Sequence, residues 1–435
     1  MSALDFDPHI SVEKPYIAHV KSPAYCVRAI NLENISRTIE TPFKVFPGNE
    51  VNKLNFSDYS SDAKNAIFES ARTVQLTSTW TTLEKCLTEM GAAQRNKKLR
   101  DIFKISKKFW ENSLTTLSLT FPRNPFEKQE FSKSTFEGLD ENSYIFLLNF
   151  IYSNSSAFVL VPDIKIKQDS SITRYLEIID FSVKQLSEWN NKPIFVPLQI
   201  DLSKRNLTQI LTHYKNNKYS NIWINFNNHP CDSDFSANLR SIKQLIDNYM
   251  NGLDVVLYYS HLKKEITPHI HDTKVAASDI LTQFLGADFI GTERFGGTHN
   301  SNSNDPEYLE SQALKNNYSS VEEYKQALMY HSTRLFNPKT YYYHSLNCYP
   351  EEIDADKFLN SKKVHYKLKN SMLLYQEVQN TKIFIQETTT DPSQTKKQLK
   401  EYLNKKSMIK ENEVIRNSII PQRIQATLFS DLANL

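Results

Sequence analysis

The sequence predicts an α/β protein with a TIM-barrel-like (β/α)8 core and a helical appendage after it. Short apolar or β-branched runs alternate with amphipathic stretches, as strands and helices do in such folds. The ends of successive runs, taken at Asp163, Asp201, Asn227, Ser260 and Thr292, lie 38, 26, 33 and 32 residues apart. A barrel of about 250 residues averages about 31 residues per strand–helix unit. The predicted strands cover residues 73–78, 114–120, 157–162, 194–200, 221–226, 254–260 and 288–291, with 43–46 as a candidate eighth strand.

The helices between these strands are predicted from apolar residues three and four positions apart. In the stretch 173–189, Leu176, Ile179, Val183 and Leu186 form one apolar face, which a helix would bury against a sheet. Similar patterns predict helices over 207–214, 237–250 and 275–285. An open, doubly wound sheet produces the same local pattern, so periodicity alone does not separate it from a closed barrel.

The chain divides into four predicted segments. Residues 1–70 form an N-terminal lead-in, 71–299 the barrel core, 300–390 a helical appendage packed on the barrel, and 391–435 a polar tail that we expect to be mobile. The tail is rich in Lys, Gln, Asn and Glu, a composition that favours solvent exposure over a packed core.

Composition excludes several classes of protein. The 52 basic residues nearly balance the 49 acidic ones, so no strong global field attracts nucleic acid or a membrane. The four cysteines lie far apart without a CxxC pair, which argues against a disulfide framework and a structural zinc cluster. No signal peptide and no run of about 20 apolar residues is found. We therefore expect a cytoplasmic protein that has no cofactor and does not contact membranes.

Polar residues follow the predicted strands at the points where each strand ends. In barrels the reacting groups lie at the carboxyl ends of the strands, although Asp or Ser in such places also caps the following helix. We expect Asp163 and Asp201 to act as acid, base or nucleophile. The other candidate ligand-binding residues at these ends are Gln199, Asn227, His229, His261 and Glu293.

Glycines are concentrated after the last predicted strand. Four of the eight glycines in the chain fall within residues 286–297. The loops after the last two strands of many barrels bind phosphate through backbone N–H groups, and Arg294 beside Gly296 and Gly297 would suit an anionic ligand. Alternatively, Gly286 ends a helix and the other glycines form turns.

Five of the eleven histidines lie between His229 and His299. His269 and His271 would point to the same side of an extended segment and could hold zinc together with His261. Against a metal site, this pair follows Pro268 in a predicted loop, and Asp272 would cap the next helix. A metal-dependent hydrolase barrel therefore remains an alternative, and no metal ligand is assigned.

The order of motifs between Ala157 and Gly291 is distinctive. It runs from Val161-Pro162-Asp163 through a helix that ends near Trp189, then to Pro197-Leu198-Gln199, and finally to the segment 286–291, whose sequence is GADFIG. This layout resembles the catalytic barrel of the tRNA-guanine transglycosylase superfamily. The resemblance implies that Asp163 and Gln199 contact the edge of a nucleobase.

Three features depart from the pattern of that superfamily. Its nucleophilic aspartate would fall at Gly291, its glycine-rich loop is replaced by residues 225–229, and its Cys/His zinc site is missing. A divergent or catalytically silent relative would show these departures, and so would an unrelated barrel.

The sequence thus leads to three functional hypotheses. The first is a divergent transglycosylase-like barrel that binds a nucleobase or small anionic ligand at its mouth and exchanges bases on nucleic acid, as a glycosyltransferase does. The second is a catalytically silent barrel that serves as a binding or scaffold subunit and meets a protein partner through its C-terminal helices. The third is the metal-dependent hydrolase. RNA contact would involve the basic and aromatic residues Lys362, Lys363, Tyr366, Lys367 and Lys369, since such groups suit phosphates and bases.

Overall fold

The computed structural model describes most of the chain. The described residues are 9–12, 25–48, 66–111, 113–132, 134–166, 172–189, 191–250, 252, 254–266, 272–293, 305–353, 364–388 and 392–419. Among them, no helix is long and apolar enough to span a bilayer.

Two parallel sheets form the centre of the molecule. In the first, the strand order is β10 (Val159–Leu160), β12 (Ile194–Gln199), β13 (Asn221–Asn225), β14 (Val256–Ser260), β16 (Phe289–Ile290) and β4 (Phe43–Lys44). In the second, it is β11 (Asp163–Ile164), β7 (Leu114–Phe121), β6 (Ile67–Thr73) and β5 (Phe46–Pro47).

The two sheets are joined along both of their edges. Strand β4 runs directly into β5 within residues 43–47, and β10 runs into β11 within residues 159–164. The ring closes where Phe43 pairs with Phe289 in parallel, and the backbone N–H of Val45 donates to the carbonyl of Ile290 at 2.8 Å. Eight parallel segments therefore surround one core. This confirms the predicted TIM-barrel-like fold.

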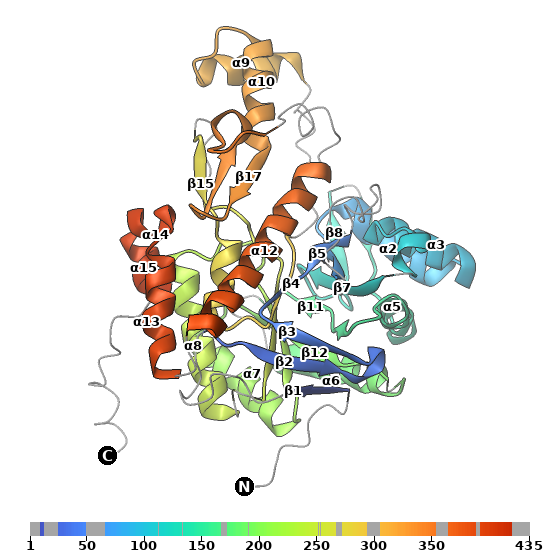
Figure 1. Cartoon of the computed structure of the whole chain (residues 1–435). Coiled ribbons are helices and arrows are strands. Elements are labelled where there is room, and N and C mark those ends of the chain that lie inside the picture. The colour runs from blue at the N-terminus through green and yellow to red at the C-terminus, as the bar shows by residue number, and fades with distance from the viewer. Residues whose placement is uncertain are drawn as a thin grey trace.

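Helices follow the strands around the outside of the ring (Figure 1). Helices α6 (Ile172–Ser187), α7 (Lys204–Asn216) and α8 (Ser233–Tyr249) correspond to predicted apolar stripes, which face the sheet. In chain order these helices are α2 (Thr77–Glu89), α3 (Ala92–Phe103), α4 (Lys107–Trp110), α5 (Glu141–Ser153), α6 (Ile172–Ser187), α7 (Lys204–Asn216), α8 (Ser233–Tyr249) and the 3-10 helix η3 (Asp279–Leu285). A small hairpin of β8 (Gln129–Phe131) and β9 (Ser134–Phe136) lies between β7 and α5.

The N-terminal stretch is more ordered than the sequence analysis expected. Strands β1 (Ile10–Val12), β2 (Arg28–Leu32) and β3 (Arg37–Thr41) form an antiparallel sheet, with the 3-10 helix η1 (Glu33–Ile35) between β2 and β3. Ile30, Leu32 and Ile39 of this sheet are buried in the cluster that fills the barrel interior. The barrel thus begins at Phe43, inside the segment that was predicted to be a lead-in.

Residues beyond the last barrel strand add both strands and helices. Strands β17 (Arg334–Asn337) and β18 (Tyr342–Ser345) form a separate antiparallel sheet with β15 (Lys274–Ala276), which precedes β16 in the chain. Helices α9 (Pro306–Lys315) and α10 (Val321–Ser332) extend to the top of Figure 1. The long helix α12 (Val364–Thr388) packs on β4 and β5 and so takes the place of the eighth barrel helix. The remaining elements are the 3-10 helix η4 (Leu346–Cys348), α13 (Pro392–Leu403), α14 (Ser407–Glu411) and α15 (Glu413–Ile419).

Three local predictions differ from the structure. The predicted helix over 275–285 is wrong, because β15 pairs with β18, which lies far away in sequence, and only the 3-10 helix η3 remains. The predicted strand over 73–78 is displaced, since β6 ends at Thr73 and helix α2 begins at Thr77. The C-terminal segment is not wholly a polar tail, because Leu403, Met408 and Ile409 are buried in the main core.

Candidate functional site

Polar side chains from six neighbouring strands fill the barrel interior at its carboxyl end. Glu69 of β6 is fully buried and lies near their centre. Its Oε1 accepts hydrogen bonds from the hydroxyls of Ser118, at 2.5 Å, and Ser260. Its Oε2 accepts from the backbone N–H of Thr292 at 2.7 Å and from its hydroxyl at 3.0 Å. One carboxylate thus links four strand ends, on β6, β7, β14 and β16.

His261 extends this network across the barrel. Its Nε2 lies 2.9 Å from Oγ of Ser118 and its Nδ1 lies 3.4 Å from Oγ1 of Thr120. The imidazole is fully buried and packs on the Trp223 ring, with centroids 5.7 Å apart. The backbone of His261 has φ +58°. A non-glycine residue in this left-handed region stores strain, which clusters at functional sites.

Asp163 occupies the other side of the network. Its carboxylate accepts from Nε2 of Gln199 at 3.0 Å, from Nδ2 of Asn225 at 2.6 Å and from the Tyr175 hydroxyl at 3.1 Å. Asn225 Nδ2 also donates to Thr120 at 3.0 Å, which joins Asp163 to the His261 side. Burial raises the pKa of Asp163 to about 6, although the three donors oppose this shift. A buried carboxylate therefore titrates close to neutral pH.

Asp201, Asn227 and His229 continue the network to the surface. The backbone N–H of Asn227 donates to Oδ1 of Asn225 at 2.9 Å, and its side chain donates to Asp201 at 3.2 Å. Nε2 of His229 lies 3.8 Å from Oδ2 of Asp201, and these two side chains are 38% and 27% exposed. Burial raises the pKa of Asp201, but the hydrogen bond from His229 and the charge of Lys165 lower it more, so the net shift is downward.

The closed ring therefore brings together six residues that were predicted from four strand ends. They form one connected set, which consists of Asp163, Gln199, Asp201, Asn227, His229 and His261. Whether they act in catalysis remains a prediction. Arg294, Gly296 and Gly297 lie outside the described residues.

The predicted residue Glu293 lies elsewhere, in a cavity at the rim of the barrel. We call it the rim cavity. It lies between the ends of β5, β14 and β16 and helix α12, and its volume is about 80 Å³. Its lining residues are Lys44, Pro47, Leu262, Lys264, Asp279, Gly291, Thr292, Glu293, Tyr343, Lys367, Asn370, Ser371 and Leu374. Thr292 belongs to both the rim cavity and the buried network.

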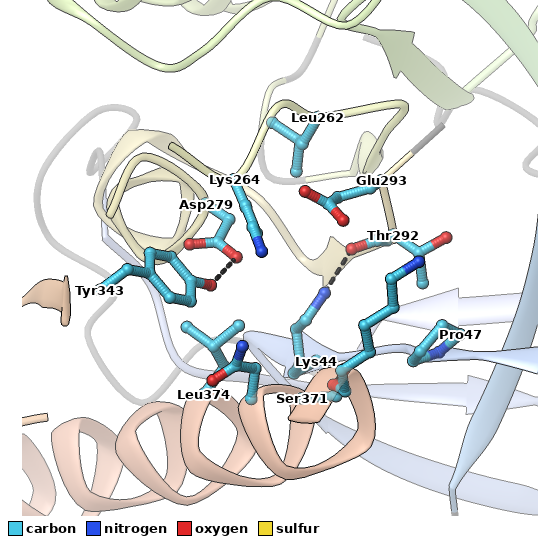
Figure 2. A pocket seen from close by; sticks show the side chains of 13 residues that line it. Lys44, Pro47, Leu262, Lys264, Asp279, Thr292, Glu293, Tyr343, Ser371 and Leu374 are labelled. Carbon is cyan, nitrogen blue, oxygen red and sulfur yellow. Dashed lines mark hydrogen bonds between the residues drawn. The ribbon is translucent and has the colours of Figure 1, made fainter. Parts of the chain in front are cut away.

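Charged groups from distant parts of the sequence face one another in the rim cavity (Figure 2). Nζ of Lys44 donates to the carbonyls of Gly291 and, at 3.4 Å, Ile290. The hydroxyl of Tyr343 donates to Oδ2 of Asp279 at 2.7 Å. Lys264 pairs with Glu265 at 3.2 Å, and its Nζ lies 5.3 Å from the centre of the Tyr343 ring.

Burial and the neighbouring charges shift the pKa values of these groups in different directions. It lowers the pKa of Lys44, against the opposing charges of Asp279, Glu69 and Glu293. It raises the pKa of Asp279 to about 6, against the charge of Lys44. For Lys264 burial acts downward, but Glu265 and Glu293 outweigh it and raise the pKa. Opposed shifts among neighbouring titratable groups are typical of acid–base sites.

The sequence analysis missed Glu69, Lys44 and Asp279. Glu69 lies in the segment 1–70 that was predicted to be a lead-in, Lys44 lies in the candidate strand 43–46, and Asp279 lies in a segment that was predicted to be a helix. A charged residue inside an otherwise buried strand was the available signal, because such residues are almost never fully buried unless they are paired.

Two residues carried over from the transglycosylase resemblance contact each other. Asp163 and Gln199 are hydrogen-bonded, and Oε1 of Gln199 also accepts from the backbone N–H of Ile166 at 3.2 Å. At Gly291, where that superfamily has its nucleophilic aspartate, an added Cβ would lie 2.6 Å from Oε2 of Glu69. The carboxylate of Glu69 therefore takes the space that a side chain at position 291 would need.

The described residues contain no group of three or more His, Cys, Asp or Glu side chains that could hold a metal ion. His269 and His271 lie outside the described residues, so the hydrolase hypothesis stays a prediction. The proposed RNA-binding face is altered at one position, since Tyr366 is buried against Leu335 and Leu346. Its ring is thus unavailable for stacking on a base, and Lys362 and Lys363 fall outside the described residues.

No protein-family model and no curated protein sequence matches this chain. Solved structures are similar to it at low identity. A Cellulomonas fimi endo-β-1,4-mannanase double mutant is 10% identical with a TM-score of 0.33, and the alignment covers 62% of this chain and 66% of the mannanase, just under two thirds of its length.

Two further structures show likenesses of the same kind. The carboxyl transferase domain of Rhizobium etli pyruvate carboxylase with pyruvate is 9% identical with a TM-score of 0.33, covering 86% of this chain and 57% of that one. A morphinone reductase mutant in complex with tetrahydroNAD is 9% identical with a TM-score of 0.27, covering 55% and 80%. Likenesses this distant carry no argument about activity, and the fold assignment rests on the strand pairing described above.

Proposed function

We propose that this protein is an enzyme that binds a small anionic molecule in the rim cavity. The observation that carries the proposal is the convergence of Lys44, Lys264, Asp279, Glu293 and Tyr343 on one cavity at the carboxyl end of a (β/α)8 barrel. Barrel enzymes place their active sites at this end, and the loops after the last two strands commonly bind phosphate. Lys264 and Glu293 lie in these loops.

The groups in the cavity divide into two chemical roles. Lys264, whose pKa is raised, stays charged at neutral pH and would hold the carboxylate or phosphate of the ligand. Lys44 and Asp279 have pKa values shifted toward neutrality, so they can exchange protons with a bound substrate. Tyr343 orients Asp279 through its hydrogen bond.

Ligand binding to the full-length protein tests the proposal. Inorganic phosphate, pyruvate and dihydroxyacetone phosphate would be screened by thermal shift and then by calorimetry, because a ligand that binds the folded state raises its apparent stability. We expect Lys264→Met to weaken binding of the best ligand about tenfold or more, which is the loss of one charge-assisted contact. Lys263→Met is the matched control, because Lys263 is the adjacent residue and its side chain does not line the cavity. Equal affinity in both variants would contradict the proposed site.

A second candidate is nucleobase binding with base exchange on nucleic acid, as the transglycosylase resemblance implies. The hydrogen bond between Asp163 and Gln199 at adjacent strand ends supports it, because the resemblance implies that both residues contact the same ligand. A thermal shift with guanine or a 7-deazaguanine that is lost in Asp163→Asn would support it. Stabilisation by none of these ligands would instead support a catalytically silent barrel that binds a protein partner.

A further inference from the structure

Lys44 occupies an unusual place for a lysine. It lies in the two-residue strand β4, only 5% of it is exposed, and its neighbours Phe43 and Val45 fill the barrel interior. Side chains alternate along a strand, so Lys44 points outward, toward helix α12 and the rim cavity. Burying a charged lysine costs free energy unless the charge is paired. A lysine that is kept in such a place is therefore a candidate for a function.

The hydrogen bonds of Lys44 suit a neutral amine. Its Nζ donates to two backbone carbonyls, those of Gly291 and Ile290. A neutral amine has two N–H groups and one lone pair, and these carbonyls account for both N–H groups. In the neutral form, the lone pair would then be left for a ligand in the cavity that Lys44 lines. Burial favours the same form, because it lowers the pKa of the amine against the charges of Asp279, Glu69 and Glu293.

From this geometry we propose that Lys44 forms an imine with a ligand that carries both a carbonyl group and an anionic group, such as a small 2-oxo acid or a keto-phosphate. The inference deepens the proposed function and rests on it. Nζ attacks the carbonyl carbon, a C–N bond forms, and the π electron pair moves to the oxygen. The nitrogen then gives up both of its protons and the oxygen takes up two, so that the C–O bond breaks, water leaves and the C=N bond of the imine forms. The exchange is balanced as amine plus carbonyl giving imine plus water, so no oxidant or reductant is needed.

Neighbouring groups can carry the protons in these steps. Asp279 and Tyr343 form a hydrogen-bonded acid–base pair, and Glu293 faces the same space (Figure 2). Lys264 supplies the positive charge for the anionic end of the ligand. A cavity of about 80 Å³ admits only a small molecule, since a single water needs about 10–15 Å³ on such a measure. The imine would withdraw electrons from the adjacent carbon, which supports proton abstraction or carbon–carbon cleavage there.

Reductive trapping tests the inference directly. The full-length protein would be incubated with pyruvate or with dihydroxyacetone phosphate in the presence of sodium cyanoborohydride, and the adduct located by intact-mass and peptide mass spectrometry. We expect a single adduct on Lys44 that is lost in Lys44→Arg and Lys44→Met. Lactate, which has no carbonyl carbon able to form this imine, should give no adduct.

The chain offers matched internal controls for this experiment. Lys192 and Lys382 are also partly or largely buried, and burial lowers the pKa of each to about 8, but neither lines the rim cavity. Adducts spread over Lys192, Lys382 and Lys44 would overturn the inference, since a depressed pKa would then explain the labelling without a site. Thermal melts of the two Lys44 variants check that they fold. If a variant does not fold, protection of Lys44 in the wild-type protein by inorganic phosphate provides the same test.

The two proposals fail in different ways. If a probe stabilises the wild-type protein, and Lys264→Met abolishes that effect, but no adduct forms, the rim cavity is a binding site and the imine inference is wrong. If no probe stabilises the protein or forms an adduct, both are wrong. An adduct on Lys44 that is unaffected by Lys264→Met would support the imine and remove the anion-binding role of Lys264.

Discussion

The amino end of the barrel is closed by an ion pair, whereas its carboxyl end is filled by carboxylates that have hydrogen-bond donors around them. At the amino end, Nε of Arg28 donates to Asp288 at 2.6 Å and its guanidinium also donates to the carbonyl of Val255. At the carboxyl end, Glu69 and Asp163 form no ion pair with any described residue and are held by hydroxyls, amides and a backbone N–H.

This difference indicates that the amino end of the barrel contributes to stability and the carboxyl end to function. A buried carboxylate with a guanidinium partner has an opposite charge beside it, which opposes its desolvation cost. One that has only neutral donors keeps part of its desolvation cost, which raises its pKa, as in Asp163. Left-handed backbone is also found at the carboxyl end, at Asn227, Asn228 and His261. The amino end therefore stabilises the ring, and the carboxyl end holds the groups that can change protonation.

The largest effect is expected from breaking the ion pair. Arg28→Met leaves the buried carboxylate of Asp288 without its partner, and we expect the free energy of unfolding to fall by about 3–5 kcal/mol. Denaturant unfolding measures this change. Arg37→Met, on the exposed part of the same small sheet, should change it by less than about 0.5 kcal/mol. Similar losses in the two variants would show that the ion pair does not close the amino end.

The second largest effect that we expect is a pH dependence of stability, which arises from Asp163. Its pKa is raised from 3.8 to about 6 in the folded protein, so the folded state binds more protons than the unfolded state between these values. Stability from this group is present at low pH and is lost as the pH rises through about 6, by roughly 3 kcal/mol in all.

Unfolding of wild-type protein and Asp163→Asn from pH 4 to pH 8 checks this sign. The stability of the wild-type protein relative to Asp163→Asn should fall as the pH rises, because only the wild-type protein loses the contribution. The exposed Asp234→Asn serves as the control. A difference that stays constant over this range would show that Asp163 remains ionised throughout.

A smaller effect is expected at Glu69. In Glu69→Gln the new NH2 group must face either the backbone N–H of Thr292, which can only donate, or the hydroxyls of Ser118 and Ser260, which would have to turn and give up their present donation. We expect a loss of about 2 kcal/mol in unfolding free energy, the cost of an unsatisfied buried polar group. The exposed Glu130→Gln should leave stability unchanged. Unaltered stability in Glu69→Gln would mean that the four hydrogen bonds are not formed in solution.

The smallest effect is expected at the outer end of the network. His229 is partly exposed and only 3.8 Å from Asp201, so the pair is screened by solvent and His229→Gln should change stability by less than about 0.5 kcal/mol. Thermal unfolding at pH 7 measures it. A loss comparable with that of Glu69→Gln would show that the network is equally rigid out to the surface.

Several elements were predictable because their pattern is local. Strands β7, β12, β13 and β14 were predicted within about two residues, since strands buried on both faces are continuous apolar runs. Helices α6, α7 and α8 followed from their apolar stripes. The prediction that Gly286 ends a helix was confirmed, as its φ of +93° places it at the end of η3.

Other elements depend on partners that are distant in the sequence. Strand β6 contains Glu69 and so lacks the continuous apolar run that marks a buried strand. Strand β15 has β18 as its partner, although most of it falls in the segment 275–285 that was predicted to be helical on periodicity alone. Such pairing overrides local preference, because strand stability comes mainly from side-chain contacts across the sheet.

The sequence by itself determined the strand–helix alternation, the polar strand ends and the glycine-poor core, because these follow from local hydrophobicity and turn chemistry. Only the tertiary structure decided that the ring closes, since closure depends on two-residue strands pairing Phe43 with Phe289. It also decided that Lys44, Asp279, Glu293 and Tyr343 line one cavity. These residues come from four different elements or loops, and no local pattern encodes their distance from one another.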